Sequence, residues 1–398
     1  MNSSRQAVKT LLVASIQYQA YYLCRFNLAT VLPLLISEFT LTHSDAGVLG
    51  SVLFLSYAFA LIPAGALGDR VGPRLVITVG AFLSLSVNVL FPYSASFLLM
   101  LLLQVVNGFG QGMAWGPLTR LMANWYPREK MGFVMSLLSV PAALGPPVAF
   151  VLSGYLAAVY GLRSAFQIPA FILAVTSLMF VLCVRNEPRG EPRVRRAAGL
   201  AGALQVLRNK GIWLVGFSYL ALYGVTRGIM AWLPTLLVER EGFSLMGAAS
   251  LGGLISLPGI PAMFLGTWIS EVKLGGRKNL VIAASLLLSI PVLAFLQFLH
   301  DPLLLPWLLG SLFAILNSAG GLYFAYPSLL VSREQVGAGS GLIDMLGYAG
   351  IFLITILIGM MVDVFKSYDP VFPVLTLVSL FGAVVILGVK PTHQVTSP

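Results

Sequence analysis

Apolar residues fill this chain in long blocks, and short polar segments separate them. Each block is long enough for a helix to cross the ~30 Å hydrocarbon core of a bilayer, which takes about 20 residues. Backbone polar groups in a bilayer must be bonded within the chain, so such runs predict spanning helices rather than a barrel. We predict twelve spans, at 10–36, 45–67, 75–92, 97–124, 132–158, 164–184, 212–237, 246–270, 279–299, 302–330, 338–364 and 370–389.

Composition supports a polytopic, all-α membrane protein. Of 398 residues, 58% are hydrophobic and 10% are charged, and the mean hydropathy is +0.90, whereas soluble domains carry about a quarter charged residues. Cys24 and Cys183 both fall in apolar stretches, so we expect neither a disulfide framework nor a thiolate metal site. The three histidines are expected in loops or the tail. We therefore expect no metal, no cofactor and no enzyme.

The distribution of Lys and Arg gives the orientation. With a cytoplasmic N-terminus, eighteen basic residues fall in inside segments and three, Arg163, Arg240 and Lys366, fall outside. Cytoplasmic loops of membrane proteins carry this excess of positive charge. We predict a multi-pass protein of the plasma membrane with both termini in the cytoplasm. The net charge of +10 does not indicate nucleic acid, because its only dense cluster lies beside membrane segments.

The chain divides into two six-helix halves, 1–184 and 212–398, joined by a cytoplasmic linker at 185–211. The linker carries seven basic residues and is expected to form a short surface helix near 199–209. Its charge serves either as an orientation signal and headgroup contact or as a regulatory site. The halves also resemble each other weakly, because the first span of each places an arginine before a proline. Parallel six-helix repeats with a central binding site are one layout of secondary transporters.

Three arginines fall inside apolar spans: Arg25, Arg120 and Arg227. A guanidinium at bilayer depth costs at least ~2.5–3.5 kcal/mol, so it is expected to face water or an anion within the helix bundle. Arg25 lies about 15 residues from the cytoplasmic end of its helix, roughly 22 Å along it. Arg227 is equally central, whereas Arg120 is near enough to a helix end to reach the headgroups. These positions predict a binding site for an anion.

Polar and aromatic residues accompany these arginines at helical spacing. Tyr18, Tyr21 and Tyr22 precede Arg25, and Tyr223 lies one turn before Arg227. The α-helical period also aligns a polar stripe on the fourth span, which faces either an aqueous cavity or a neighbouring helix. The stripe consists of Gln104, Asn107, Gln111 and Trp115.

Asp344 is the one acidic residue well inside an apolar span. It either couples transport to protons, by titrating as substrate competes for an arginine, or forms a fixed ion pair with Arg120 or Arg227. The tenth span adds Tyr323 among glycines, and Gly320-Gly321, Tyr326-Pro327, Pro258 and the Pro146-Pro147 pair are candidate bending points.

The segment Gly65-Ala66-Leu67-Gly68-Asp69-Arg70-Val71-Gly72-Pro73-Arg74 resembles the loop 2–3 motif of the major facilitator superfamily, and this resemblance extends over essentially the whole chain. It implies that Asp69 helps to latch the two halves, with Arg70 and Arg74 as its neighbours.

Within that superfamily, Ala20-Tyr21-Tyr22-Leu23-Cys24-Arg25-Phe26-Asn27-Leu28 is similar to the first helix of organophosphate:phosphate antiporters and anion:cation symporters. Two further strings resemble the same families: Phe109-Gly110-Gln111-Gly112-Met113-Ala114-Trp115, followed by Arg120, and Gly347-Tyr348-Ala349-Gly350. The resemblance implies that Arg25 binds the anionic group of the substrate.

The chain also departs from both families. Leu61 stands where sugar-phosphate antiporters carry a lysine, Ser139 where they carry a histidine, and Thr226 where they carry a second arginine. Arg227 is one residue away from that position, which turns its side chain by about 100° around the helix. Cys24 replaces the acid that precedes the first-helix arginine in proton-coupled symporters.

We therefore expect a monomeric secondary active transporter that moves a small organic anion by alternating access, with a proton or a counter-anion as coupling partner. The absent lysine and histidine favour a carboxylate over a phosphate ester. The alternative is an organophosphate:inorganic phosphate antiporter, and a more distant one is an anion channel or sensor. The expected substrate-binding residues are Arg25, Tyr22, Tyr18, Gln111, Arg120, Tyr223, Arg227, Tyr323 and Tyr348.

Overall fold

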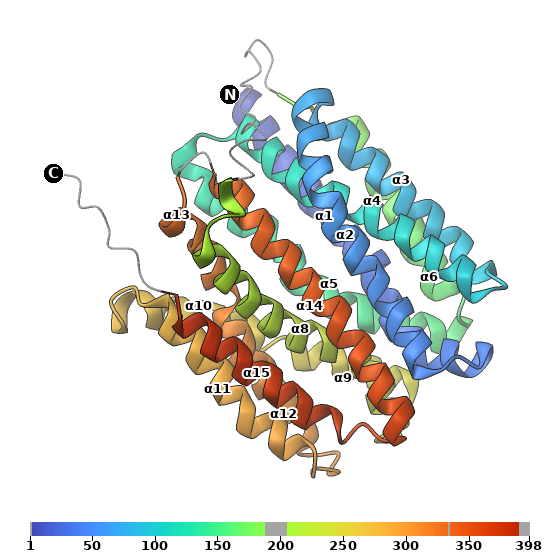
Figure 1. The fold of residues 1–398 in the computed structure, drawn as a ribbon. Helices are drawn as coiled ribbons and strands as arrows, with labels where there is room; N and C mark the ends of the chain where they lie inside the picture. The colour runs from blue at the N-terminus through green and yellow to red at the C-terminus, as the bar shows by residue number, and fades with distance from the viewer. Residues whose placement is uncertain (1, 188–204, 333–334, 390–398) are drawn as a thin grey trace. The chain divides into compact units, whose positions relative to one another are not determined.

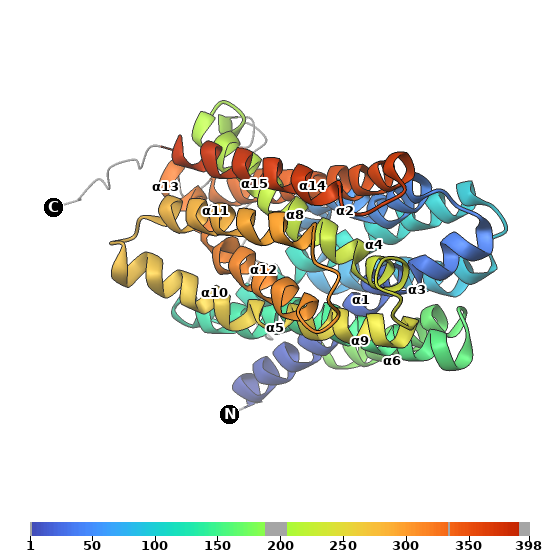
Figure 2. The same ribbon diagram turned by 90° about the horizontal axis from the view of Figure 1, so that it is seen from below.

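The computed structural model describes residues 2–187, 205–332 and 335–389, and in these ranges the chain is helical with no strand. Figure 1 shows the helices in chain order, and Figure 2 shows them from below. Eleven segments in the described ranges are long and apolar enough to cross a membrane. A shorter apolar helix, α15 (Val371–Leu387), follows them. The predicted all-α membrane fold is confirmed.

Helices of the first half match the predicted spans to within a few residues at most ends. The largest difference is at the start, where helix extends back to Asn2 through polar turns. The helices are α1 (Asn2–Phe39), α2 (His43–Val71), α3 (Pro73–Leu90) followed by η1 (Phe91–Tyr93), α4 (Phe97–Trp125), α5 (Arg128–Tyr160) and α6 (Ser164–Cys183).

Helices of the second half include two spans that are divided into shorter pieces. The helices are α8 (Lys210–Glu239), α9 (Leu245–Ser256), α10 (Gly259–Trp268) followed by the π-helix η2 (Ile269–Lys273), α11 (Lys278–Leu296), α12 (Leu305–Gly320) followed by η3 (Gly321–Ala325), α13 (Pro327–Leu330), α14 (Val336–Phe365) and α15.

The divisions fall at residues that the sequence singles out as bending points. Helix α9 ends just before Pro258, which caps α10, and a proline cannot donate the hydrogen bond that would continue a helix. Helix α12 gives way to a 3₁₀ turn at Gly321. By contrast, α5 runs without interruption through the Pro146-Pro147 pair. Residues 188–204 lie outside the described residues, so most of the predicted linker and its surface helix stay a prediction.

Two compact units make up the chain. Unit 1 consists of Met1–Thr40, Val52–Ala197 and Leu233–Gly253, and unit 2 consists of Leu41–Ser51, Ala198–Trp232 and Leu254–Pro398. Helices α2 and α8 therefore each begin in unit 2 and continue in unit 1. The units describe packing, and the predicted division into 1–184 and 212–398 stays a prediction.

Unit 1 is built around α1. This helix lies against α5 and α6, while α3 lies against α4 and α6. Aromatic rings fill the space between them: Phe26 is 6.0 Å from Phe54 and 6.1 Å from Phe150, measured between ring centroids. Burying rings of this size supplies much of the packing energy of a helix bundle.

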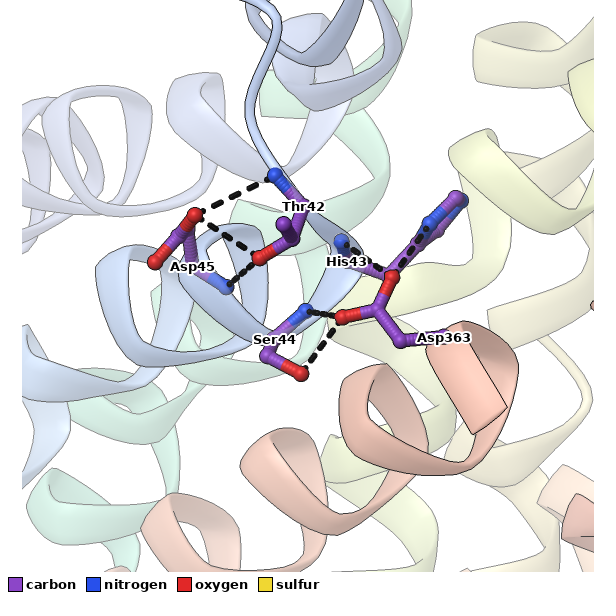
Figure 3. A network of polar contacts seen from close by, with 5 residues as sticks. All are labelled: Thr42, His43, Ser44, Asp45 and Asp363. Carbon is purple, nitrogen blue, oxygen red and sulfur yellow. Dashed lines mark hydrogen bonds and ion pairs between the residues drawn. The ribbon is translucent and has the colours of Figure 1, made fainter. Parts of the chain in front are cut away.

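Unit 2 packs α11 against α12 and α15, and α10 against α12, as both Figure 1 and Figure 2 show. The first turn of α2 also belongs to it and meets the last turn of α14 (Figure 3). The Asp363 carboxylate accepts hydrogen bonds from the backbone N–H groups of His43 (2.9 Å) and Ser44 (2.7 Å). It also accepts one from the Ser44 hydroxyl over 2.5 Å. Asp363 thus satisfies the unpaired N–H groups at the start of α2 and complements its dipole.

The sequence predicts that His43 lies in a loop, and this prediction is wrong, because α2 begins at this residue. Its Nδ1 lies 3.2 Å from Asp363, and its ring stacks on Trp232 with 5.9 Å between centroids. Thr42 and Asp45 complete the helix start, because the backbone N–H of Asp45 donates to the Thr42 hydroxyl, which donates to the Asp45 carboxylate (Figure 3). This reciprocal arrangement is a capping box, and it extends the helix beyond the predicted start.

Candidate functional site

Arg25 is buried in unit 1, with 5% of its surface exposed. Its Nε and Nη2 atoms both donate to Oε1 of Gln111 on α4, each over 3.1 Å. A buried cation must be hydrogen-bonded, since leaving it without partners costs several kcal/mol or more. The structure therefore brings together two residues that the sequence selects from different helices.

Two tyrosine rings flank the Arg25 guanidinium. Its Cζ lies 4.6 Å from the ring centroid of Tyr22 and 4.7 Å from that of Tyr57 on α2. Rings within about 6 Å attract a cation through the negative face of their π-system. Sequence reasoning missed Tyr57. The available signal was its position one helical turn before Leu61, a spacing that puts the two residues on one face of α2.

A second layer of aromatic rings supports Tyr22. Tyr18 meets the Tyr22 ring edge-on at 5.2 Å and stacks on Trp115 at 5.4 Å between centroids. On the other side, α5 approaches so closely at Gly145 that a Cβ atom there would lie 2.3 Å from Cγ of Tyr22. A side chain at position 145 would displace the Tyr22 ring, so this glycine makes room for the aromatic partner of Arg25.

The polar stripe on α4 is buried and bonded to neighbouring helices. Nε2 of Gln111 donates to the carbonyl of Tyr21 (3.1 Å) and to the hydroxyl of Ser84 on α3 (2.9 Å). That hydroxyl donates in turn to Oδ1 of Asn107 (2.7 Å), and Asn107 donates to Oε1 of Gln104 (3.3 Å). Of the two interpretations of the stripe, packing between helices is the one these contacts support.

Arg227 on α8 contacts an aromatic ring and a sulfur of its own helix. Its Cζ lies 5.4 Å from the Tyr223 ring, and its Nη1 donates to the Met230 sulfur over 3.2 Å. Thr226 directs its hydroxyl to the carbonyl of Leu222 in its own helix. Because adjacent residues point about 100° apart on a helix, Arg227 and Thr226 do not share a face.

Tyrosines cluster around this second arginine. Tyr219 stacks on Tyr223 at 4.9 Å and contacts Tyr323 at 4.8 Å, while Tyr223 meets Tyr348 edge-on at 5.7 Å, measured between centroids. The hydroxyls of Ser218 and Tyr323 are 2.8 Å apart. The structure thus brings together the three tyrosines selected from the sequence. Sequence reasoning missed Tyr219, whose signal was its position one turn before Tyr223.

Asp344 is half-buried on α14 and interacts electrostatically with Tyr219. In the described parts of the chain, its carboxylate forms no hydrogen bond and no ion pair. The fixed ion pair with Arg120 or Arg227, one of the two interpretations of this acid, is therefore not found there. The coupling role stays a prediction.

Arg120 lies nine residues after Gln111 on α4, which places it roughly 13 Å further along the helix axis. It is half-buried and close to the helix end at Trp125. Arg25 and Arg120 are therefore at different depths of unit 1, and the choice between a headgroup contact and a substrate contact stays open.

The loop between α2 and α3 is fixed by Gly72 and by contacts with the end of α6. Gly72 has a φ of 97°, a conformation that favours glycine. The backbone N–H of Arg74 donates to Oδ1 of Asn186 over 2.8 Å, and its guanidinium donates to a carbonyl near the end of α6. Arg70 is exposed, and the side chain of Asp69 lies outside the described part of the structure.

These sites are suited to binding anions. Buried arginine and tyrosine offer N–H and O–H donors, which is what a carboxylate or phosphate requires. Among the described residues, no group of three or more His, Cys, Asp or Glu side chains is placed to hold a metal ion.

Comparisons with known proteins agree with this picture. The glycerol-3-phosphate transporter of Bacillus subtilis is 29% identical over 84% of this chain and 81% of its own length. The phosphoglycerate transporter protein of Salmonella typhimurium is 25% identical over 90% and 84%, respectively. The probable sulfoacetate transporter of Cupriavidus necator is 27% identical over 99% and 97%.

The fold is also that of a solved transporter. A bacterial homologue of the human lysosomal transporter Spinster, in an inward-facing and unoccupied conformation, matches with a TM-score of 0.78 over 96% of this chain and 95% of that one, at 19% identity. Residues 14–355 match the family model described as Major Facilitator Superfamily. The chain is therefore a multi-pass membrane transporter that belongs to the Major Facilitator Superfamily and resembles its organophosphate-transporting branch.

Proposed function

We propose that this transporter exchanges a phosphorylated organic anion for inorganic phosphate, and that Arg25 binds the anion. The observation that carries the proposal is the buried Arg25 guanidinium, held by Gln111 between the rings of Tyr22 and Tyr57. Arginine offers a planar fork of donors that matches the oxygens of a phosphate. Its charge is permanent, so the site remains attractive to anions at any physiological pH.

The relatives change the choice of substrate. From the absent lysine and histidine, the sequence favours a carboxylate, but two of the relatives above are named for phosphorylated compounds, and the carboxylate preference is not supported. The third is named for sulfoacetate, which carries, besides its carboxylate, a sulfonate group with three terminal oxygens, the number that a phosphate monoester also has. A group with three terminal oxygens is therefore common to the compounds for which the three relatives are named.

Exchange also removes an energetic obstacle. Moving one net negative charge inward against a negative-inside potential costs ~2.3 kcal/mol per 100 mV. Returning an anion of equal charge in each cycle cancels that cost, so no proton is needed. Asp344 then has no obligatory coupling role. Proton movement that accompanies exchange, and that is lost in Asp344→Asn, would instead show proton coupling.

The other selected residues take supporting roles in the proposal. Tyr22 and Tyr57 hold Arg25, and Tyr18 supports Tyr22. Asp69 and Arg70 at the end of α2 and Arg74 at the start of α3 act in gating. The residues selected from unit 2 are further candidates for substrate contact: Tyr223, Arg227, Tyr323 and Tyr348. We place the protein in the cytoplasmic membrane, with both termini inside, on the basis of the eighteen basic residues in cytoplasmic segments.

Counterflow in liposomes tests the proposal. Purified protein is reconstituted into vesicles loaded with inorganic phosphate, and uptake of labelled phosphate is measured in the presence of glycerol-3-phosphate, 3-phosphoglycerate, sulfoacetate or acetate outside. We expect saturable exchange that the phosphate esters inhibit at least ~10-fold more strongly than acetate, a difference of ~1.4 kcal/mol in binding.

Two results would contradict the proposal. Exchange inhibited by acetate and not by the esters would restore a carboxylate substrate. Phosphate efflux that does not saturate and needs no external anion would indicate a channel rather than an exchanger. Empty liposomes and the Arg25→Gln variant serve as controls for leakage.

A further inference from the structure

We propose that Gln111 is a positioning residue that fixes the orientation of Arg25 without reducing its charge. This inference rests on the proposed function, in which Arg25 binds the anion. Gln111 is fully buried, and a single oxygen of its side chain accepts from both Nε and Nη2 of Arg25. Two bonds to one atom fix both the plane and the rotation of the guanidinium between its flanking rings.

The orientation of the Gln111 amide follows from its surroundings. Nε2 faces the backbone carbonyl of Tyr21 at 3.1 Å. A carbonyl can only accept a hydrogen bond, so the NH₂ group of the amide must point to it. The oxygen of the amide is then the atom that faces Arg25.

A second backbone carbonyl, that of Cys24, fixes the same orientation of the Gln111 amide through a chain of hydrogen bonds. Nδ2 of Asn107 lies 3.2 Å from the carbonyl of Cys24, so Oδ1 of Asn107 faces Ser84. The Ser84 hydroxyl therefore donates to Asn107, and its oxygen is left to accept from Nε2 of Gln111. Two backbone carbonyls of α1 thus fix an acceptor opposite an arginine of the same helix. A fully satisfied network of this kind specifies one arrangement of the buried side chains.

A glutamine fits this role better than a glutamate. A carboxylate at position 111 would accept the same two bonds, but it would also neutralise Arg25 and repel an incoming anion. It would further lack the N–H groups that satisfy Tyr21 and Ser84. A neutral acceptor holds the guanidinium and leaves its full charge to attract substrate.

The test uses the full-length transporter with inorganic phosphate as probe, and three variants. Gln111→Met keeps the length of the side chain but removes the acceptor for Arg25 together with the N–H groups that bond Tyr21 and Ser84. Gln111→Glu keeps the acceptor but adds a charge. Gln104→Met is the matched control, because Gln104 is buried on the same helix and accepts a hydrogen bond from Asn107. Phosphate exchange is measured at several pH values, and each variant is divided by the wild type at the same pH to remove the titration of phosphate itself.

We expect Gln111→Met to raise the half-saturating phosphate concentration about 10-fold with little change in maximal rate, the effect of one lost hydrogen-bond partner. Gln111→Glu should lower exchange about 100-fold at pH 7.5 and recover as the pH falls, because a protonated glutamate is again a neutral acceptor. The titratable groups around Arg25 and Gln111 include those of Arg25, Tyr21, Tyr22, Cys24 and Tyr57. None of them loses most of its protons at or below pH 7.5 when unperturbed. Gln104→Met should stay within about 2-fold of the wild type.

Equal losses in Gln111→Met and Gln111→Glu, without recovery at low pH, would overturn the inference, because a purely structural role predicts them. Wild-type activity in Gln111→Glu would overturn it as well. A second measurement does not depend on transport: in protein labelled with ¹⁵N-arginine, the Arg25 Nε–H resonance should shift in Gln111→Met and not in Gln104→Met. If the wild type fails to exchange phosphate, the proposed function fails, and this resonance still decides the role of Gln111.

Discussion

Arg25 and Arg227 occupy matching places in sequence and differ in what holds them. Each lies deep in the first helix of its half, before a proline and after a tyrosine. The partners of Arg25 include a fixed amide oxygen and two rings, whereas those of Arg227 include one ring and the sulfur of Met230. A thioether is a weak acceptor on a flexible side chain. The first site is rigid, and the second is adaptable.

The difference predicts that the two arginines contribute unequally to substrate binding. A preorganised site binds a charged group tightly because little ordering remains to be done when the ligand arrives. A site with flexible partners can adjust to organic groups of different shapes. We infer that the anionic group, common to all substrates, is bound at Arg25, and that Arg227 contributes less to binding it.

Replacing Arg25 by lysine is expected to have the largest effect. Lysine keeps the charge but lacks the planar fork, so it cannot make the paired bonds to Gln111 or present a fixed edge to phosphate. We expect phosphate exchange to fall at least ~100-fold, equivalent to ~2.7 kcal/mol. Counterflow in liposomes measures this loss, with circular dichroism as a control for folding. Near-normal exchange in Arg25→Lys would show that charge alone is enough and would remove the basis for the comparison.

The corresponding change at the second arginine should cost less. In Arg227→Lys the charge and the contact with the Tyr223 ring are retained, and the bond that is lost goes to a weak thioether acceptor. We expect a loss of about 5- to 10-fold in exchange of a phosphate ester, or roughly 1 kcal/mol. Counterflow in liposomes measures this loss as well. A larger loss than in Arg25→Lys would reverse the assignment of the two sites.

Much of this arrangement could be predicted from the sequence, because it depends on local spacing. Long apolar runs predicted the spans, and the 3.6-residue period predicted that Tyr22 lies beside Arg25 and Tyr223 beside Arg227. Contacts between helices could not be predicted in the same way. Tyr57 reaches Arg25 from another helix, and nothing in the sequence of α2 fixes its rotation about its own axis.

Burial was the second feature that the sequence left open. A stripe of amides has the same spacing whether it faces water or a neighbouring helix, and only the bonds of Gln111 and Asn107 to adjacent helices separate the two. The sequence likewise could not predict whether Asp344 forms an ion pair, and none is found in the described residues. Whether an acid meets an arginine depends on how the helices pack, and composition does not record that.

Tyr57 offers a finer test of the first site. Tyr57→Leu removes a ring whose centroid lies 4.7 Å from the guanidinium, and such a contact is worth ~0.5–2 kcal/mol. We expect the half-saturating phosphate concentration to rise about 5-fold. Tyr57→Phe keeps the ring and should stay within about 2-fold of the wild type, as expected for a cation–π contact. An equal loss in both variants would assign the effect to the hydroxyl instead.

Met230 gives the smallest effect and the most direct comparison of the two sites. Met230→Leu removes the sulfur that accepts from Arg227 while keeping a similar apolar volume, a change that cores usually tolerate. Because a thioether is a weak acceptor, we expect less than about a 2-fold change in half-saturating concentration for phosphate esters. Gln111→Met is the comparison at the first site, because it puts a thioether in place of the amide that holds Arg25. There we expect the half-saturating concentration to rise about 10-fold. Equal effects of the two substitutions in one titration would mean that both arginines tolerate soft partners, and the rigid character assigned to the first site would then be wrong.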